Sequence, residues 1–242
     1  MLFDLLAAMR SGNAEDLKIT VSIILLSLPV ILLALCVHEV AHGYVASKLG
    51  DPTAKSMGRL TLNPLKHLDP FGFLAMLCFG FGWARPVPIN PRYFKKPRQG
   101  MAICALAGPI SNILMALLFN VGYKLLSNAT GTVVRGGAIY YYTELGMADF
   151  AVILCYLGVT LNITLAVFNL LPIPPLDGSK VLYTFLPPKA YFNMLNYERY
   201  ITLGFFVYLL FEQYLPLQPI SMILGFLSDR VYELFDLILF FI

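Results

Sequence analysis

Two of the three histidines in the chain, His38 and His42, flank a glutamate in the order His-Glu-x-x-His. On a helix, residues four apart lie one above the other on the same face, so both imidazoles can ligate a single zinc ion. Glu39 is offset from His38 by about 100° around the helix. Its carboxylate can therefore hold a water beside the metal. The spacing predicts a hydrolytic metal site at residues 38–42.

The position of these residues strengthens this interpretation. Residues 21–37 form an uncharged apolar run, and the three ionisable side chains follow directly after it. Unpaired ionisable groups are costly in a membrane, so they are rare there and usually paired or functional. The alternative is that these residues are interfacial polar groups at the end of a membrane span. Three ionisable residues within five positions favour the metal site.

A hydrolytic zinc site takes three protein ligands and keeps one position open, so a third ligand is needed. Asp177 follows a long apolar segment that is broken by three prolines, and such a break at membrane depth is tolerated where it lines a cavity. The same residues also form an ordinary turn, so the spacing alone leaves both interpretations open. Asp149 fits better as an acid at a helix start. His67 and Asp69 remain alternatives, and His67 fits best as a surface or loop-stabilising histidine.

The elements that must position these groups are apolar. The chain is 58% hydrophobic and 13% charged, with a mean hydropathy of +0.73. We expect an all-α polytopic membrane protein with five to six transmembrane or re-entrant helices and a small membrane-associated β element. It forms one domain, residues 1–242, with a core of about 19–186 and C-terminal helices of about 200–242. The apolar segments are residues 19–49, 71–83 (short), 101–126, 147–171, 200–215 and 219–242.

The polar stretches between these segments carry further expectations. Residues 53–62 have the short alternation of a strand or hairpin, and the proline-rich residues 84–99 indicate an extended surface loop. The last segment contains four charged residues, so it either spans the membrane or lies along its interface. The four cysteines indicate buried free thiols, and the N-terminus does not resemble a cleavable signal peptide.

Charge distribution predicts the orientation. If the 13-residue segment 71–83 does not cross, the two segments that carry the histidines and Asp177 end on the same side. The loops on that side hold most of the lysines and arginines, so the site opens toward the cytoplasm of a multi-pass cell-membrane protein. The net charge of +3 is small, and we expect no nucleic-acid partner.

Three motifs together resemble the site-2 protease family of intramembrane zinc metalloproteases: HEVAH at residues 38–42, GPISN at 108–112 and NLLPIPPLDG at 169–178. The similarity is to compact prokaryotic members without a PDZ domain. It implies His38, His42 and Asp177 as Zn²⁺ ligands, Glu39 as the base, and Asn112 as a contact to substrate or oxyanion. It also implies a membrane-anchored protein or peptide substrate, held by a small sheet for which residues 53–62 are the candidate.

Two other functions remain open at this point. A membrane zinc transporter would also place histidine and aspartate in its spans, although it needs no glutamate between the histidines. A catalytically inactive scaffold of the same fold would retain the motifs without turnover. No segment is long and polar enough for a PDZ module, so access to the site would depend on helix motion, loops or a regulatory membrane partner.

Overall fold

The structure is a computed structural model that describes residues 1–79, 82–135, 138–140 and 147–241. Residues 80–81, part of the predicted short segment, and the last residue of the predicted C-terminal segment lie outside the described residues. The helices are α1 (Leu2–Ser11), α2 (Ala14–Lys48), α3 (Thr53–Ser56), α4 (Pro70–Phe79), α5 (Pro97–Thr130), α6 (Met147–Leu170), α7 (Asp177–Phe185), α8 (Pro188–Phe211) and α9 (Pro219–Ile238). Short 3₁₀ turns cover Pro64–Lys66, Pro91–Tyr93 and Glu212–Tyr214.

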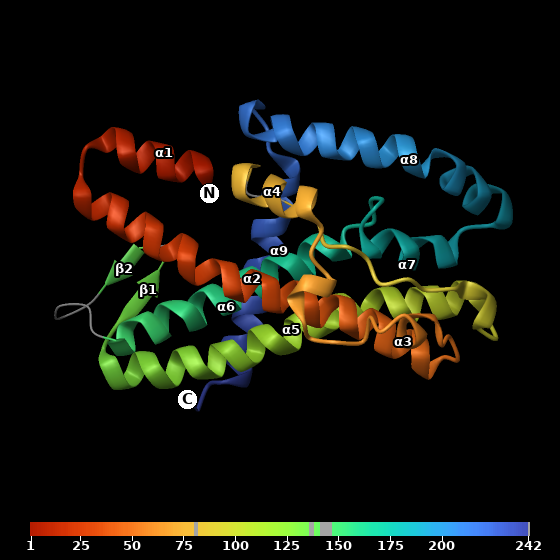
Figure 1. Ribbon diagram of the computed structural model, residues 1–242, viewed down its shortest axis with the longest axis horizontal. Coiled ribbons are helices and arrows are strands. Elements are labelled where there is room, and N and C mark those ends of the chain that lie inside the picture. The colour runs from red at the N-terminus through yellow and green to blue at the C-terminus, as the bar shows by residue number, and fades with distance from the viewer. Residues whose placement is uncertain (80–81, 136–137, 141–146, 242) are drawn as a thin grey trace.

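Three of the described helices are long and apolar enough to cross a membrane, namely α2, α5 and α6. They lie side by side with α5 running opposite to the other two, and each pair is in contact (Figure 1). The sequence sets the ends of α5, because Pro97 suits the first helical turn and Gly131 closes the last one with φ 76°. The predicted polytopic all-α fold is therefore confirmed.

Helix α4 has ten residues and is about 15 Å long, half the thickness of a bilayer core. It is too short to cross, which agrees with the expectation for residues 71–83. The C-terminal ends of α2 and α6 consequently lie at the same end of the bundle (Figure 1). This arrangement allows a residue shortly after α6 to reach the histidines of α2.

The strand expected at residues 53–62 is wrong. Thr53–Ser56 form the short helix α3, and Gly58 turns the chain with φ 61°. The carboxylate of Asp51 explains this difference, because it accepts hydrogen bonds from the backbone N–H and the hydroxyl of Thr53 and so starts a helical turn. The described strands lie elsewhere: β1 (Val133–Arg135) and β2 (Ala138–Tyr140) form an antiparallel pair after α5.

The C-terminal segments form two helices, and α8 begins twelve residues earlier than the predicted segment 200–215. Helix α9 passes behind α6 in Figure 1, where Phe235 packs in a cluster with Val159 and Ile163. Three of the charged residues that interrupt the last segment are in ion pairs. Asp236 lies 3.2 Å from Lys124 of α5, and Arg230 lies 2.6 Å from Glu233.

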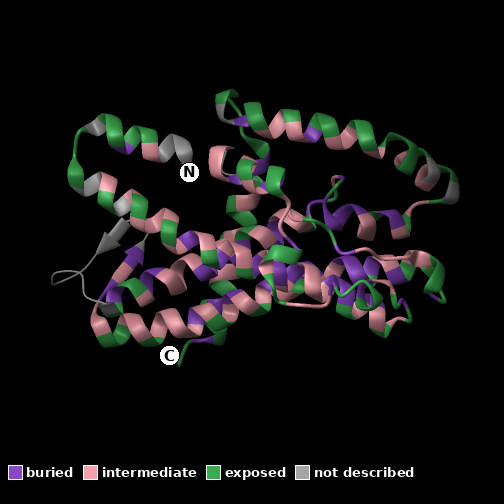
Figure 2. Ribbon diagram, in the orientation of Figure 1, coloured by how far each residue is buried: buried purple, intermediate pink, exposed green. Residues whose placement is uncertain are grey.

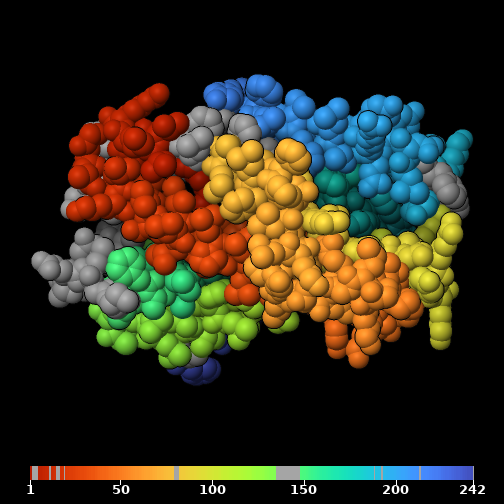
Figure 3. Space-filling model, in the orientation of Figure 1, coloured from red at the N-terminus to blue at the C-terminus, as the bar shows by residue number. Residues whose placement is uncertain are grey.

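Burial is concentrated where the site residues are found. Buried residues gather along α6 and where α2, α5 and α7 meet, whereas α8 is mostly exposed or half-buried (Figure 2). In Figure 3 the segment between α2 and α5, drawn in orange and yellow, covers the middle of the molecule. This segment lies over the histidine-bearing end of α2.

Candidate metal centre

His38, His42 and Asp177 converge in the interior of the protein. Among the described residues they form a group whose ligand atoms all lie within 4.8 Å of one another, and all three residues are buried. The Oδ2 atom of Asp177 is 3.1 Å from Nε2 of His38 and 3.1 Å from Nε2 of His42. Two residues one helical turn apart on α2 thus meet a residue 135 positions later in the chain.

The other nitrogen of each ring is engaged by a neighbour. Nδ1 of His42 lies 2.7 Å from the backbone carbonyl oxygen of Cys104, which can only accept, so this nitrogen carries the hydrogen. Nδ1 of His38 lies 2.5 Å from Oδ1 of Asn112. The Asn112 amide nitrogen donates to the carbonyl of Ala34 and to Oδ1 of Asn162, so its oxygen is the acceptor and His38 is again the donor.

Asn112 therefore contacts the His38 ring at Nδ1, on the side away from Asp177. It is fully buried, and both its amide oxygen and its amide nitrogen are occupied by protein partners. Asn162 on α6 extends the network, since its own nitrogen donates to the carbonyl of Gly158 over 2.8 Å. These contacts make Asn112 a positioning residue for His38, and the contact to substrate or oxyanion that the family resemblance implies stays a prediction.

The approach of α5 to the histidines depends on a missing side chain. A Cβ atom built at Gly108 would lie 2.5 Å from Cε1 of His38 and 2.5 Å from Nε2 of His42. Such contacts are far inside van der Waals separation. The glycine of the GPISN motif thus lets the α5 backbone pass directly against both rings, which also brings Asn112, one turn later, within reach of His38.

Asp177 is the first residue of α7, directly after the proline-rich break that follows α6. A Cβ atom at Gly178 would collide with the carbonyl oxygens of Leu170 and Leu171, so this glycine allows α7 to start against the end of α6. Burial alone would raise the pKa of the Asp177 carboxyl. The contacts with His38 and His42 and the nearby Lys180 ammonium outweigh burial and hold the pKa well below its ordinary value.

Glu39 is half-buried and does not belong to the three-residue group. Its Oε2 atom accepts a hydrogen bond of 2.8 Å from the backbone N–H of Val87. Residues 84–90 reach the helix here because Gly43 leaves room, since a Cβ atom there would lie 2.9 Å from a Val87 methyl carbon. Arg59 holds the same segment by donating to the carbonyl oxygens of Arg85 and Pro86.

The other candidate ligands lie outside this group. His67 is buried rather than on the surface, and its Nε2 lies 2.8 Å from the carbonyl oxygen of Thr61, so it stabilises the loop. Asp69 accepts a hydrogen bond from the backbone N–H of Gly72 at the start of α4. Asp149 lies in the first turn of α6, as expected for a helix-start acid, and accepts a hydrogen bond from Thr132.

The donor set fits zinc. With hydrogen on both Nδ1 atoms, the two Nε2 atoms are the nitrogens available for ligation, and they converge with one carboxylate oxygen on a single point, an arrangement that a cation stabilises. Metal–ligand bonds of about 2.0–2.1 Å in a tetrahedron separate neighbouring ligand atoms by about 3.3 Å. The observed separations of 3.1 Å are close to this value. Two nitrogens and one oxygen leave a fourth position free.

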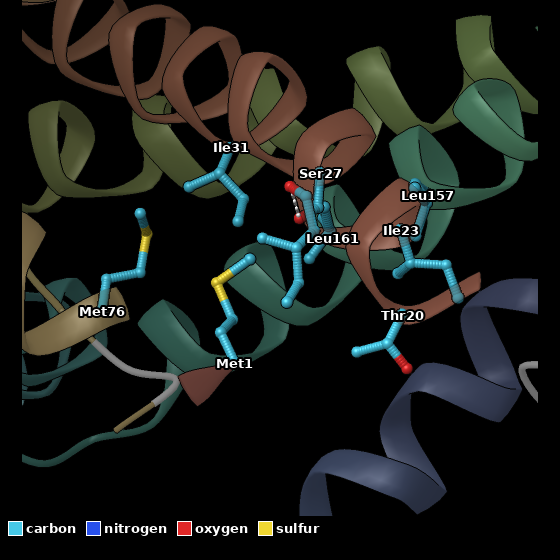
Figure 4. A pocket seen from close by; sticks show the side chains of 9 residues that line it. Met1, Thr20, Ile23, Ser27, Ile31, Met76, Leu157 and Leu161 are labelled. Atoms are coloured by element: carbon cyan, nitrogen blue, oxygen red, sulfur yellow. Dashed lines mark hydrogen bonds between the residues drawn. The ribbon is translucent and has the colours of Figure 1, made fainter. Parts of the chain in front are cut away.

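A separate cavity of about 360 Å³ lies beside α2 and α6 (Figure 4). Its lining is largely aliphatic and includes Ile31, Met76 and Leu161. None of the three converging residues lines it.

Several groups at the site were not anticipated from the sequence as functional. Val87 and Cys104 contact the site through backbone atoms. Because such contacts do not depend on the type of side chain, only the structure reveals them. Asn162 is one of few polar residues in the spans, and this rarity is a usable signal for a buried network. Lys180 lies three residues after Asp177, a spacing that brings side chains together on a helix.

Comparisons with known proteins agree with this geometry. Residues 26–211 match the profile of peptidase family M50, the site-2 protease family. The chain is 44% identical over 179 residues to a Bacillus subtilis protein named "Putative zinc metalloprotease YwhC", covering 74% of this chain and 76% of that protein. It is 32% identical over 164 residues to "Putative zinc metalloprotease Rip2" of Mycolicibacterium smegmatis, covering 66% of this chain and 56% of that protein.

A third relative comes from an archaeon. "Putative zinc metalloprotease MJ0611" of Methanocaldococcus jannaschii is 32% identical over 147 residues, covering 60% of this chain and 62% of that protein. The chain thus spans just over half the length of the Rip2 protein and three quarters of YwhC. No solved structure gives a significant match. The chain belongs to peptidase family M50 and is a membrane protein with the role of a zinc metalloprotease.

Proposed function

We propose that this protein is an intramembrane endopeptidase of the HExxH type that cuts membrane-anchored proteins or peptides. The observation that carries this proposal is the convergence of His38, His42 and Asp177 on one point inside an apolar bundle. His38 lies within the membrane-span candidate Thr20–Lys48, ten residues before its end, which corresponds to about 15 Å along the helix. This depth supports cleavage inside the bilayer rather than at its surface.

Each residue has a role that its contacts support. His38, His42 and Asp177 would hold the zinc, which when bound supplies Lewis acidity that makes water more acidic and polarises a carbonyl. Glu39, adjacent to the group but outside it, would take a proton from the attacking water and deliver it to the leaving amine. Asn112 and Cys104 keep the two imidazoles in the tautomer and orientation that ligation requires.

The substrate would have to be locally extended, because the backbone amides of a helix are bonded internally. Residues 53–62 do not offer a strand for this purpose. The segment beside Glu39 is residues 84–90, which forms an isolated β-bridge at Ala84 and whose N–H at Val87 contacts the Glu39 carboxylate. Edge pairing of substrate would therefore involve this segment.

Orientation and partners follow from charge. Most of the basic residues lie in segments 48–99 and 180–199, at the end of the bundle that carries the site, and this bias supports a multi-pass cell-membrane protein whose site opens toward the cytoplasm. The partners would be the lipid bilayer, a membrane-anchored protein substrate and a regulatory membrane protein. We propose no nucleic-acid partner, since the net charge is only +3.

The test uses membrane vesicles from cells that lack this protein. Purified wild-type protein or the Glu39→Gln variant is added with zinc, and new peptide N-termini are identified by mass spectrometry, with zinc flux measured in the same vesicles. The proposal expects new N-termini inside transmembrane segments, formed by wild type alone. Zinc flux without cleavage would identify a transporter, and the absence of both would identify an inactive scaffold.

A further inference from the structure

The two carboxylate oxygens of Asp177 have different partners. Oδ2 lies between the two histidine rings, 3.1 Å from each Nε2 atom. Oδ1 faces the other way and lies 3.2 Å from the ammonium nitrogen of Lys180. The carboxylate is therefore divided between the metal group and a lysine on its own helix.

Helix α7 fixes this relationship. Lys180 is three residues after Asp177, so both side chains lie on the same face of the helix. Asp177 is the first helical residue and is held against the end of α6 by the close approach at Gly178. The lysine side chain is 38% exposed, so its ammonium reaches Asp177 while staying partly hydrated. The carboxylate itself is only 8% exposed, which makes its few contacts decisive.

We infer that Lys180 is a positioning residue that keeps Asp177 a one-oxygen ligand of the metal. Zinc accepts a carboxylate through one oxygen in a four-coordinate site, and a carboxylate that also binds through its second oxygen raises the coordination number. An oxygen whose lone pairs accept a charge-assisted hydrogen bond is a poorer ligand, and turning it toward the metal would break that bond. Lys180 thereby preserves the open fourth position.

This role differs from holding the metal in place. A cation beside a dication does not strengthen metal binding by attraction, so removing Lys180 should not release the ion. It should instead free Oδ1 to rotate toward the metal. The inference rests on the proposed zinc site and adds a control of its coordination number.

The test replaces Lys180 by methionine, which has an unbranched side chain of similar length but no ammonium group. Zinc per chain is measured, together with the coordination number from X-ray absorption at the zinc edge, on full-length protein in detergent. Wild type should contain one zinc with four ligands, including water. The Lys180→Met variant should keep one zinc but show a fifth oxygen ligand, and Lys180→Arg should restore four.

The matched control is Lys189→Met, at an exposed lysine on α8, which should match wild type. Four ligands in the Lys180→Met variant would overturn the inference. Loss of zinc from that variant would also overturn it, because the lysine would then be holding the site together. A wild-type protein without zinc at these residues would refute the proposed function itself, which is a distinct result.

Discussion

The Oδ1 atom of Asn112 lies 2.5 Å from Nδ1 of His38 and joins the metal-facing histidine to a buried amide network. Through Asn162 this network connects all three membrane-span helices, because His38 belongs to α2, Asn112 to α5 and Asn162 to α6. The orientation of the ring is thus set by the packing of the bundle. A substitution that disturbs helix packing at this point should therefore change zinc binding.

Replacing Asn112 by leucine removes the acceptor for His38 and keeps the number of heavy side-chain atoms and the branch at Cγ. We expect zinc affinity to fall about 10–100-fold, as for other partners that orient a metal-binding histidine. Competition with a zinc chelator measures this directly. Asn128→Leu, at an exposed position on the same helix, is the control and should bind as wild type does. Unchanged affinity in Asn112→Leu would show that the ring needs no such support.

Glu39→Gln should separate metal binding from catalysis. The side chain lies outside the converging group, so the variant should retain one zinc per chain, while cleavage falls about 10²–10⁴-fold through loss of the base. Glu198→Gln on α8 serves as the control. Cleavage by Glu39→Gln at the wild-type rate would remove Glu39 from the mechanism.

Gly108→Ala should disrupt the site from the side of α5. The added methyl group would lie 2.5 Å from atoms of both histidine rings, so the rings or the helix must move and zinc content should fall. Alanine otherwise favours a helix over glycine by about 1 kcal/mol, so a loss cannot be attributed to helix propensity. Gly204→Ala, where nothing lies within 4 Å of the new Cβ atom, should leave zinc content unchanged. Full zinc content in Gly108→Ala would contradict the observed packing.

Asp51→Ala should lower the stability of the protein and weaken the dependence of that stability on pH in the acid range. The buried Asp51 carboxylate accepts hydrogen bonds from Thr53 and from the backbone N–H of Asn90. Losing it removes the acceptor from donors on the half-buried Thr53 and Asn90, and each donor that water does not reach costs about 1–3 kcal/mol. Thermal unfolding in detergent measures the difference between variant and wild type.

The sign of the pH effect at Asp51 follows from its hydrogen bonds. Burial by itself raises the pKa of this carboxyl, but the contacts from Thr53 and Asn90 outweigh burial and lower it. A lowered folded-state pKa gives stability that is present above the unfolded value of about 4 and is lost as pH falls through the folded value. The gap between wild type and Asp51→Ala should therefore narrow only below about pH 4. Asp229 is exposed, so the control variant Asp229→Ala should have the same stability as wild type both above and below that pH.

The sequence predicted the apolar helices well because length and hydropathy are local properties. Residues 147–171 match α6 within one residue, and residues 101–126 lie inside α5. The strand at residues 53–62 failed because alternation of three apolar residues was weaker than the local hydrogen bonds from Asp51 to Thr53. A short apolar pattern cannot reveal a side chain that starts a helical turn.

The candidate site was predictable in part for a related reason. The spacing of His38 and His42 is a local property, and on a helix it places both side chains on the same face. Spacing alone does not decide the role of Asp177, since its distance to the histidines depends on how α6 packs against α2. The GPISN motif points to Asn112, but the contact of Asn112 with His38 depends on the close passage of α5 at Gly108, which only the assembled bundle defines.

The central claim is that His38, His42 and Asp177 share one zinc ion. Crystals of the purified protein, measured on both sides of the zinc absorption edge, would locate the ion by its anomalous scattering. We expect one peak within about 2.0–2.2 Å of Nε2 of both histidines and Oδ2 of Asp177, and no peak there in Asp177→Ala. A zinc peak elsewhere, or an undiminished peak at the histidines in Asp177→Ala, would contradict the account.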